Sequence, residues 1–368
     1  MKIICEKSLL QHAVAMTSRA ANARSPIAAL EGIHLRAENE TVTLYGSDGT
    51  LSIRCTLEAA VPEPGETVLP ARLLSEILNK FDECEIRLET DDNNLVMVCG
   101  PSRTTLCMMD PESYPRFPEY AKQGGVALYS GKLVSMIDQT VFATAVSEDK
   151  PILTGIMMEL GEATLRMVAL DGYRLAIREE IVQSGMQGAE VVVPARSMRE
   201  IASILPDDES TVRLYAADHL LAVSTDTVEV TTRVLQGDYV KYRNILPAEH
   251  ATRVVADRTS LYSSLERASI LARQSKTNLV NLMIDGDVMT VTSDSEVGRA
   301  REEVGIQLTG KNLSIAFNAR YLLDVLKEVR DDALIFDFNT SISPCVIRPL
   351  QGDSFYYLVL PVKTNGAA

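Results

Sequence analysis

The sequence lacks the features that mark membrane and metal-binding proteins. Its 368 residues contain no run of about 18 uncharged apolar residues, so we expect no membrane-spanning segment. Glu6 and Lys7 interrupt the N-terminal stretch too early for the apolar core of a signal peptide. The six cysteines form no Cys-x-x-Cys pair and have no histidine at zinc-ligand spacing. We therefore expect a cytoplasmic protein without metal, with reduced cysteines, several of them in cores.

The sequence also lacks the common signatures of enzymes. It contains no Gly-x-Gly-x-x-Gly, no phosphate-binding loop, no His-Glu-x-x-His and no Gly-x-Ser-x-Gly. The four histidines, His12, His34, His219 and His250, lie in different contexts, and none has an evident catalytic partner. These absences predict a protein with no cofactor and no catalytic residues.

Charge is unevenly distributed along the chain. The formal net charge of −14 argues against a simple nucleic-acid binder, which normally carries a basic surface. The segments that we expect to be helical nevertheless contain more Lys and Arg than Asp and Glu, so the negative excess lies elsewhere. A general preference of Lys and Arg for helices explains only part of this bias, because Glu favours helices equally. A surface built from these helices would attract phosphate.

The chain repeats itself three times. Residues 69–81, 193–205 and 317–329 align without gaps, and their second positions are Pro70, Pro194 and Asn318, at equal intervals of about 124 residues. Each copy continues with Ala-Arg and with apolar residues at helical spacing, which predicts a helix. Three unrelated domains matched by chance would not be expected to keep two equal intervals.

Each third of the chain has the same order of expected elements. A helix at 8–20, 132–145 or 260–272 opens it, alternating segments typical of antiparallel strands follow, and the repeat helix comes later. The predicted fold class is α+β, with three repeated domains that each have two helices packed on antiparallel sheets. We expect domains at 1–120, 126–246 and 247–364, and a flexible tail at 365–368.

An aspartate also recurs in each third. Asp48, Asp171 and Asp294 follow strand-like runs at equal spacing. A carboxylate kept in all three copies is best explained as turn chemistry, because an active site would diverge in the copies that do not use it. The alternative is an enzyme built from α+β repeats that uses Asp171 and Arg174 as site residues.

Two short motifs add a family resemblance. Residues 170–176 read Leu-Asp-Gly-Tyr-Arg-Leu-Ala, and residues 356–364 read Tyr-Tyr-Leu-Val-Leu-Pro-Val-Lys-Thr. Together with the three-fold repeat, they resemble the bacterial DNA polymerase III β subunit, the sliding clamp, from residue 1 to about residue 364. The resemblance implies that two subunits join head to tail into a closed ring of clamp-type domains.

The resemblance also implies a function and its partners. The ring would encircle double-stranded DNA without reading its sequence, and would give processivity to the replicative polymerase without chemistry of its own. Implied partners are the polymerase α subunit, the clamp loader and repair polymerases, which would bind through short linear motifs. Such a protein would be cytoplasmic and associated with the nucleoid during replication. A ring-shaped scaffold that does not bind DNA remains the other alternative.

The resemblance implies three sets of site residues. An apolar groove between the middle and last domains would hold a peptide with Leu or Phe anchors. Its positions are Leu153, Leu170, Gly172, Tyr173, Arg174, Leu175, Val240, Ile245, Asn318, Tyr321, Pro344, Leu358, Leu360, Pro361 and Val362. DNA contacts would come from the basic residues Arg24, Arg72, Lys150 and Arg196. The subunit interface would use Leu106, Ile270 and Leu271, although the last two could equally lie in a core.

Two groove positions depart from the family pattern. Leu170 stands where many members have threonine, and Val240 where some have proline. Both changes are expected to make the groove more apolar and to shift its peptide preference.

Overall fold

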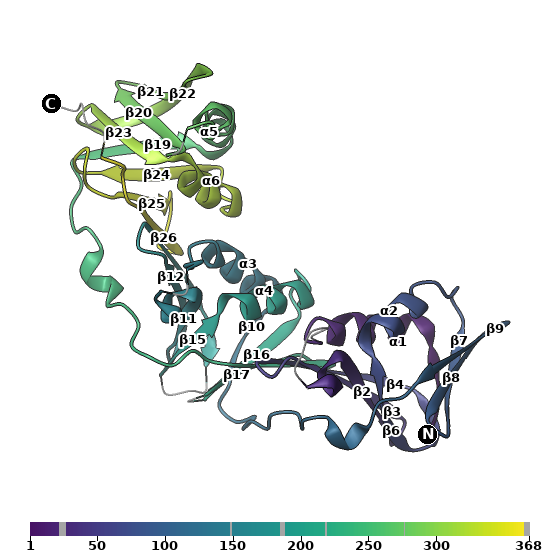
Figure 1. The fold of residues 1–368 in the computed structure, drawn as a ribbon. Helices are drawn as coiled ribbons and strands as arrows, with labels where there is room; N and C mark the ends of the chain where they lie inside the picture. The colour runs from purple at the N-terminus through teal and green to yellow at the C-terminus, as the bar shows by residue number, and fades with distance from the viewer. Residues whose placement is uncertain (22–26, 148, 185–187, 218, 276, 364–368) are drawn as a thin grey trace. The chain divides into compact units, whose positions relative to one another are not determined.

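The computed structural model describes residues 1–21, 27–147, 149–184, 188–217, 219–275 and 277–363. Arg24 and the expected tail at 365–368 lie outside these residues. The chain divides into two compact units. The first consists mainly of Met1–Gly131 and Glu200–Val234, and the second mainly of Lys132–Gln183 and the residues from Leu235 onward. Figure 1 shows the elements of each unit.

The described residues contain six α-helices, and they confirm the repeat. Three of them begin within the repeated Pro-Ala-Arg or Asn-Ala-Arg segments, each at the alanine. In the third copy the side chain of Asn318 caps the helix by accepting a hydrogen bond from the backbone N–H of Arg320 at 3.0 Å. The helices are α1 (Lys7–Ser18), α2 (Ala71–Leu78), α3 (Ser130–Val141), α4 (Ala195–Ile204), α5 (Arg258–Ala272) and α6 (Ala319–Glu328).

The first unit contains two antiparallel sheets. The five-stranded sheet has the order β5 (Ala60–Glu63), β1 (Lys2–Glu6), β7 (Glu85–Asp91), β8 (Asn94–Cys99) and β9 (Ser102–Cys107). The nine-stranded sheet has the order β14 (Gln183–Ser184), β10 (Val126–Tyr129), β16 (Thr211–Ala217), β17 (Leu220–Ser224), β18 (Val228–Arg233), β4 (Leu51–Glu58), β3 (Thr41–Ser47), β2 (Gly32–Glu38) and β6 (Gly65–Pro70). Because β18 pairs with β4, strands from the first and middle thirds share one sheet.

Helix α1 packs closely on the strands of the first unit. A Cβ atom on Gly46, in β3, would lie 2.1 Å from the carbonyl oxygen of Thr17, so only glycine allows the end of the helix to sit this close. The apolar face of α1 faces β3 and β4, and Leu10, Ala13 and Val14 are almost fully buried. This helix therefore covers the core of the first unit.

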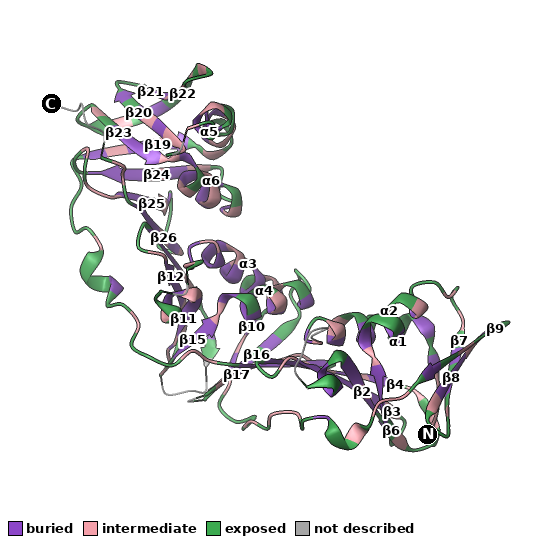
Figure 2. Cartoon of the chain, viewed as in Figure 1, coloured by how far each residue is buried: buried purple, intermediate pink, exposed green. Residues whose placement is uncertain are grey.

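The second unit contains one continuous sheet of twelve strands. Their order is β15 (Ala189–Pro194), β11 (Gly155–Leu160), β12 (Thr164–Leu170), β13 (Arg174–Ile181), β26 (Phe355–Val359), β25 (Cys345–Pro349), β24 (Ala333–Phe338), β19 (Thr252–Asp257), β22 (Gly298–Gly310), β21 (Val288–Ser295), β20 (Leu279–Asp285) and β23 (Leu313–Asn318). The β13–β26 pair joins strands of the middle and last thirds. In Figure 2 most of these strands are largely buried, except β22, whereas the connecting loops are mostly exposed. The α+β class with antiparallel sheets is confirmed.

The recurring aspartates make a turn in two thirds of the chain but not in the last. Asp48 and Asp171 each accept hydrogen bonds from the backbone N–H groups two and three residues ahead, at 2.8–3.0 Å, and each precedes a glycine with positive φ. Asp294 instead lies inside β21, with Oδ2 2.8 Å from Nε of Arg299 on the paired strand. The expectation of a turn is wrong there because β21 and β22 continue to pair beyond Asp294.

The expectation of six reduced cysteines is wrong for one pair. Cys84 and Cys99 form a disulfide across the β7–β8 hairpin, with Cα atoms 5.9 Å apart. The hairpin brings together two cysteines 15 residues apart, which their spacing alone did not reveal. Cys5, Cys55 and Cys345 are buried free thiols, and burial raises the pKa of both Cys5 and Cys55 to about 11.

Candidate partner-binding site

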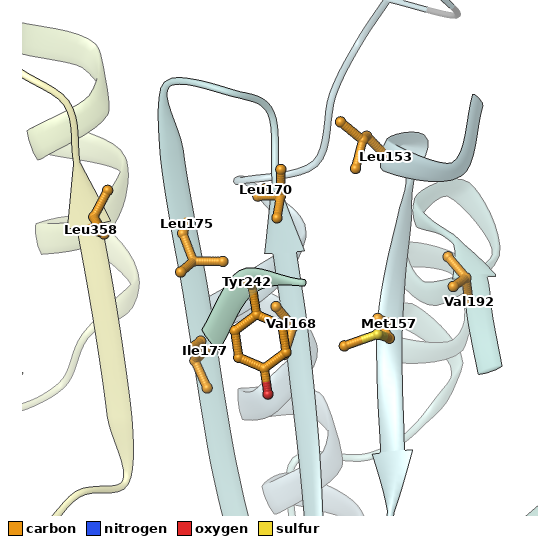
Figure 3. Packing of buried hydrophobic residues seen from close by; sticks show 9 residues of the cluster. All are labelled: Leu153, Met157, Val168, Leu170, Leu175, Ile177, Val192, Tyr242 and Leu358. Atoms are coloured by element: carbon orange, nitrogen blue, oxygen red, sulfur yellow. The ribbon is translucent and has the colours of Figure 1, made fainter. Parts of the chain in front are cut away.

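Four of the predicted groove residues form a buried apolar floor on one face of the twelve-stranded sheet. They are Leu153, Leu170, Leu175 and Leu358, each at most 5% exposed and all in one cluster. Leu175 lies directly opposite Leu170 on β12 and opposite Leu358 on β26, so the three side chains share a face. Figure 3 shows them on neighbouring strands, with Leu153 beside β11. The sheet thus gathers residues that are distant in sequence.

A short linker helix, which was not expected from the sequence, packs over this floor. The aromatic ring of Tyr242, in η4 (Tyr242–Ile245), lies over the strands in Figure 3 and is 4% exposed. Its hydroxyl donates to Oε1 of Glu159 at 2.9 Å, while Arg243 and Arg166 bond Oε2 at 2.6 and 3.0 Å. Glu159 therefore holds the linker helix against the sheet through Tyr242 and Arg243, while Arg166 of β12 binds the same carboxylate.

Exposed apolar side chains border the floor. Tyr173 is 61% exposed, and Val240, Ile245 and Leu360 are 36–48% exposed. The backbone N–H of Leu360 donates to the carbonyl of Tyr173 at 2.9 Å, so the segment after β26 follows the β12–β13 turn. The ring of Tyr173 stacks on Tyr321 of α6, with centroids 6.0 Å apart. Exposed large apolar residues next to a buried apolar floor are typical of a peptide-binding surface.

Arg174 connects this turn to two helices. Its guanidinium donates from Nε to Asp171 at 3.1 Å, from Nη1 to Asp324 at 2.5 Å, and from Nη2 to the carbonyl of Phe142 at 2.5 Å. It also lies 4.8 Å from the centre of the Tyr321 ring. Both carboxylate oxygens of Asp171 are engaged, one by backbone N–H groups and one by Arg174. The pair therefore has a structural role, which removes the basis for the enzyme alternative.

The other predicted groove residues have local roles. Asn318 caps α6, and Gly172 adopts a φ of +95° in the turn. The N–H of Val362 bonds to the carbonyl of Ala316 on β23 at 2.8 Å, and Pro361 before it is half-buried. Pro344 lines a cavity of about 250 Å³ next to the linker.

The predicted DNA-contacting residues that the structure describes are all exposed. Arg72 and Arg196 occupy the second position of α2 and α4, and Lys150 precedes η3 (Pro151–Thr154). Arg320 occupies the same position in α6 and is also exposed. Sequence reasoning missed Arg320, although it follows Arg196 at the repeat interval. Arg24 lies outside the described residues.

The predicted interface residues differ in exposure. Ile270 on α5 is 62% exposed, whereas Leu271 is half-buried with its side chain against Gly298. Leu106 lies on β9, the edge strand of the five-stranded sheet, but its side chain is only 8% exposed. Ile270 therefore offers the largest apolar surface of the three.

The described residues offer no candidate metal site and no membrane-spanning helix. No group of three or more His, Cys, Asp or Glu side chains in that part of the chain could hold a metal ion. No helix there is long and apolar enough to cross a membrane.

Three sequence families match the chain along almost its whole length. They are described as the N-terminal, central and C-terminal domains of the DNA polymerase III beta subunit, and they match residues 1–118, 127–241 and 243–363. The chain belongs to the DNA polymerase III β subunit family. Members of this family are sliding clamps, processivity factors that bind DNA and polymerase partners and have no catalytic activity of their own.

Individual β subunits are similar over the same length. The beta sliding clamp of Staphylococcus aureus is 30% identical over 359 residues, which cover 95% of each chain. The sliding clamp of Bacillus subtilis has a TM-score of 0.95 at 28% identity and covers 99% of each chain. A Pseudomonas aeruginosa sliding clamp bound to griselimycin has a TM-score of 0.94 at 26% identity and covers 99% of this chain and all of its own. The three clamp-type domains expected from the repeat are thus those of the DNA polymerase III β subunit.

Proposed function

We propose that two copies of the chain close head to tail into a ring around duplex DNA. The observation that carries this proposal is an exposed arginine at the same position of all three repeat helices, Arg72, Arg196 and Arg320. Cations repeated at a fixed interval suit the phosphate backbone, which is itself repetitive and carries no sequence information. Contacts of this kind are weak and sensitive to salt, so the ring slides and is retained by its topology.

The ring needs a seam, and two strand edges support one. Among the described residues, β9 pairs only with β8, and the first half of β22 pairs only with β21. Unpaired strand edges present N–H and C=O groups for another chain. We propose that β9 of one copy lies along the first half of β22 of the other. Ile270 and Leu271 of one copy would make the apolar contact with the other copy, near Leu106 of β9.

The apolar floor and its exposed border serve as the partner site in this proposal. A short segment with Leu or Phe anchors would bury its side chains against Leu360, Ile245 and Tyr173, above the floor. The replicative polymerase, the clamp loader and repair polymerases would compete for it. Leu170, buried at 5% exposure, makes the floor apolar where threonine would add a hydroxyl.

Domain limits and location complete the proposal. We place the three domains at 1–120, 126–246 and 247–364, and the matched family ranges support these limits. A clamp of DNA replication works in the cytoplasm. Association with the nucleoid during replication follows if the ring encircles chromosomal DNA.

Retention on DNA tests the proposal. The protein would be loaded with ATP and a clamp loader from the same organism onto nicked circular DNA, and half of the sample would then be cut once with a restriction enzyme. We expect the protein to remain on circles and to leave linear DNA within minutes. Equal loss from both forms, with the loader shown to hydrolyse ATP, would refute encirclement.

A further inference from the structure

The buried floor continues sideways across the sheet into a polar site. Leu175 lies opposite Leu358, Leu358 opposite Val346, Val346 opposite Asp337, and Asp337 opposite Arg253. Directly opposed residues of antiparallel strands project on the same face. The row therefore runs from the apolar floor to a buried ion pair over four neighbouring strand pairs.

The polar end of this row carries an excess of positive charge. Asp337 is 6% exposed and accepts hydrogen bonds from Arg253 at 2.7 and 3.1 Å and from Arg348 at 3.2 and 2.6 Å. Burial alone would raise the pKa of Asp337, but the hydrogen bonds from both arginines outweigh it and lower that pKa. Two guanidinium groups thus share one carboxylate. The trio of Arg253, Asp337 and Arg348 therefore carries one uncompensated positive charge.

A cavity of about 250 Å³ opens beside this trio. It is lined by Pro247 and His250, which follow η4, by Pro344, which precedes β25, and by Arg348 and Tyr356 of the sheet. Pro344 is also a predicted groove residue, so the cavity adjoins the proposed partner site.

One lining residue, Tyr356, carries a polar group without a partner among the described residues. The hydroxyl of Tyr356 is buried and makes no hydrogen bond to any residue that the structure describes. Burial raises the pKa of Tyr356 to about 12, so the hydroxyl remains a donor at neutral pH. The other acidic residue of the lining, Glu249, is exposed, so solvent and salt screen its charge more than that of the trio.

We propose that this cavity receives the side-chain carboxylate of an acidic residue next to the apolar anchors of a partner peptide. This inference rests on the proposed partner site and adds a specificity element to it. Arg348 would supply the charge and Tyr356 the hydroxyl donor, a combination that favours a carboxylate over an amide of the same shape. The row of opposed side chains makes the apolar and acidic contacts parts of one surface.

The test compares matched peptides. Fluorescein-labelled, C-terminally amidated nonapeptides would carry a Leu-Phe pair and a single Glu. The Glu would be placed in turn at each of the three positions on either side of the Leu-Phe pair. Each Glu peptide would have a counterpart with Gln at the same position. Binding to the full chain and to Tyr356→Phe would be measured by fluorescence anisotropy at low and high salt. We expect one Glu position to bind about tenfold more tightly than Gln, and most of that difference to disappear in Tyr356→Phe and in Arg348→Gln.

The outcomes separate this inference from the proposal on which it rests. If Glu and Gln peptides bind equally well at every position, the acidic site is refuted while the apolar site stands. If no peptide binds, the apolar site itself is refuted, and the acidic site with it. If the Gln peptide gains affinity only when its C-terminus is left as a free acid, the occupant is a terminal carboxylate and the side-chain assignment is wrong. Tyr356→Phe removes only an unbonded hydroxyl, and its unfolding curve verifies that the fold is intact.

Discussion

Arg174 uses three nitrogens of one guanidinium to join the β12–β13 turn, the residue that follows α3, and α6. It is 8% exposed, and its removal would leave the carboxylates of Asp171 and Asp324 without their buried partner. We expect Arg174→Met to lower the free energy of unfolding by about 3–5 kcal/mol, measured in urea. Arg320→Met is the matched control, because Arg320 is exposed and lies 3.7 Å from the same Asp324. Its expected loss is below about 1 kcal/mol, and a similar loss in both variants would contradict this role for Arg174.

Glu229 makes the stability of the first unit depend on pH. It accepts hydrogen bonds from Lys122 at 2.5 Å and from Tyr120 at 3.0 Å, and it pairs with Arg54. Burial alone would raise its pKa, but the bonds from Lys122 and Arg54 outweigh burial and lower the pKa of Glu229. Because the folded pKa is below the unfolded value of about 4.3, the stabilisation is complete above that pH. It is lost as the pH falls through the folded pKa.

The corresponding measurement is thermal unfolding between pH 7 and pH 3. Glu229→Gln is expected to be less stable than the wild type by about 1–3 kcal/mol at pH 7, and the difference should shrink as the pH approaches 3. Glu38→Gln removes an exposed carboxylate that pairs with Arg36, and it should change stability little. A difference for Glu229→Gln that stays constant over this range would exclude the ionised carboxylate as its cause.

Such residues were hard to predict from sequence. Glu159, Glu229 and Asp337 each collect partners that come together only when strands pair, and nothing in the local pattern distinguishes them from solvated acidic residues. Tyr242 was missed for a similar reason, because η4 is too short to show periodicity. Arg320 could have been found, since the repeat interval leads directly to it.

At the scale of elements, helices were more predictable than turns. The spacing of apolar residues located α2, α4 and α6, because a helix buries one stripe whatever its tertiary context. The Asp48 and Asp171 turns were also anticipated. Asp294 was not, since the length of a hairpin depends on how far two strands continue to pair, which a single strand's sequence does not state. The pairing of β18 with β4 and of β13 with β26 was likewise beyond the sequence pattern.

The segment after β26 offers a test of the partner site. Leu360 is 36% exposed on the border of the floor, so an aspartate there is solvated in the free protein but would be buried under a bound peptide. We expect Leu360→Asp to weaken binding of a Leu-Phe peptide at least about tenfold, measured by fluorescence anisotropy. Leu350→Asp, at a residue 50% exposed outside the border, is the control. Equal affinities for wild type and Leu360→Asp would remove this residue from the site.

At the scale of the whole molecule, the ring requires a second copy. Ile270 is 62% exposed and Leu271 half-buried, so replacing both by alanine removes apolar contact area while disturbing the monomer core little. We expect the double variant to sediment as a monomer at concentrations at which the wild type is dimeric, in analytical ultracentrifugation. Ile342→Ala, which removes an equally exposed side chain of the second unit, should leave the dimer unchanged. A double variant that remains dimeric would place the seam elsewhere.

The shared twelve-stranded sheet has a consequence for synthesis on the ribosome. Strand β13 completes its pairing only with β26, and Arg178 bonds the carbonyl of Ser354, 176 residues later. At about 5–20 residues per second, the nascent chain carries β13 with an open edge for roughly 10–35 seconds. During that interval neighbouring chains on the same messenger RNA expose identical edges. The speed of translation between β13 and β26 therefore governs how often β13 pairs within its own chain rather than with a strand of a neighbouring copy.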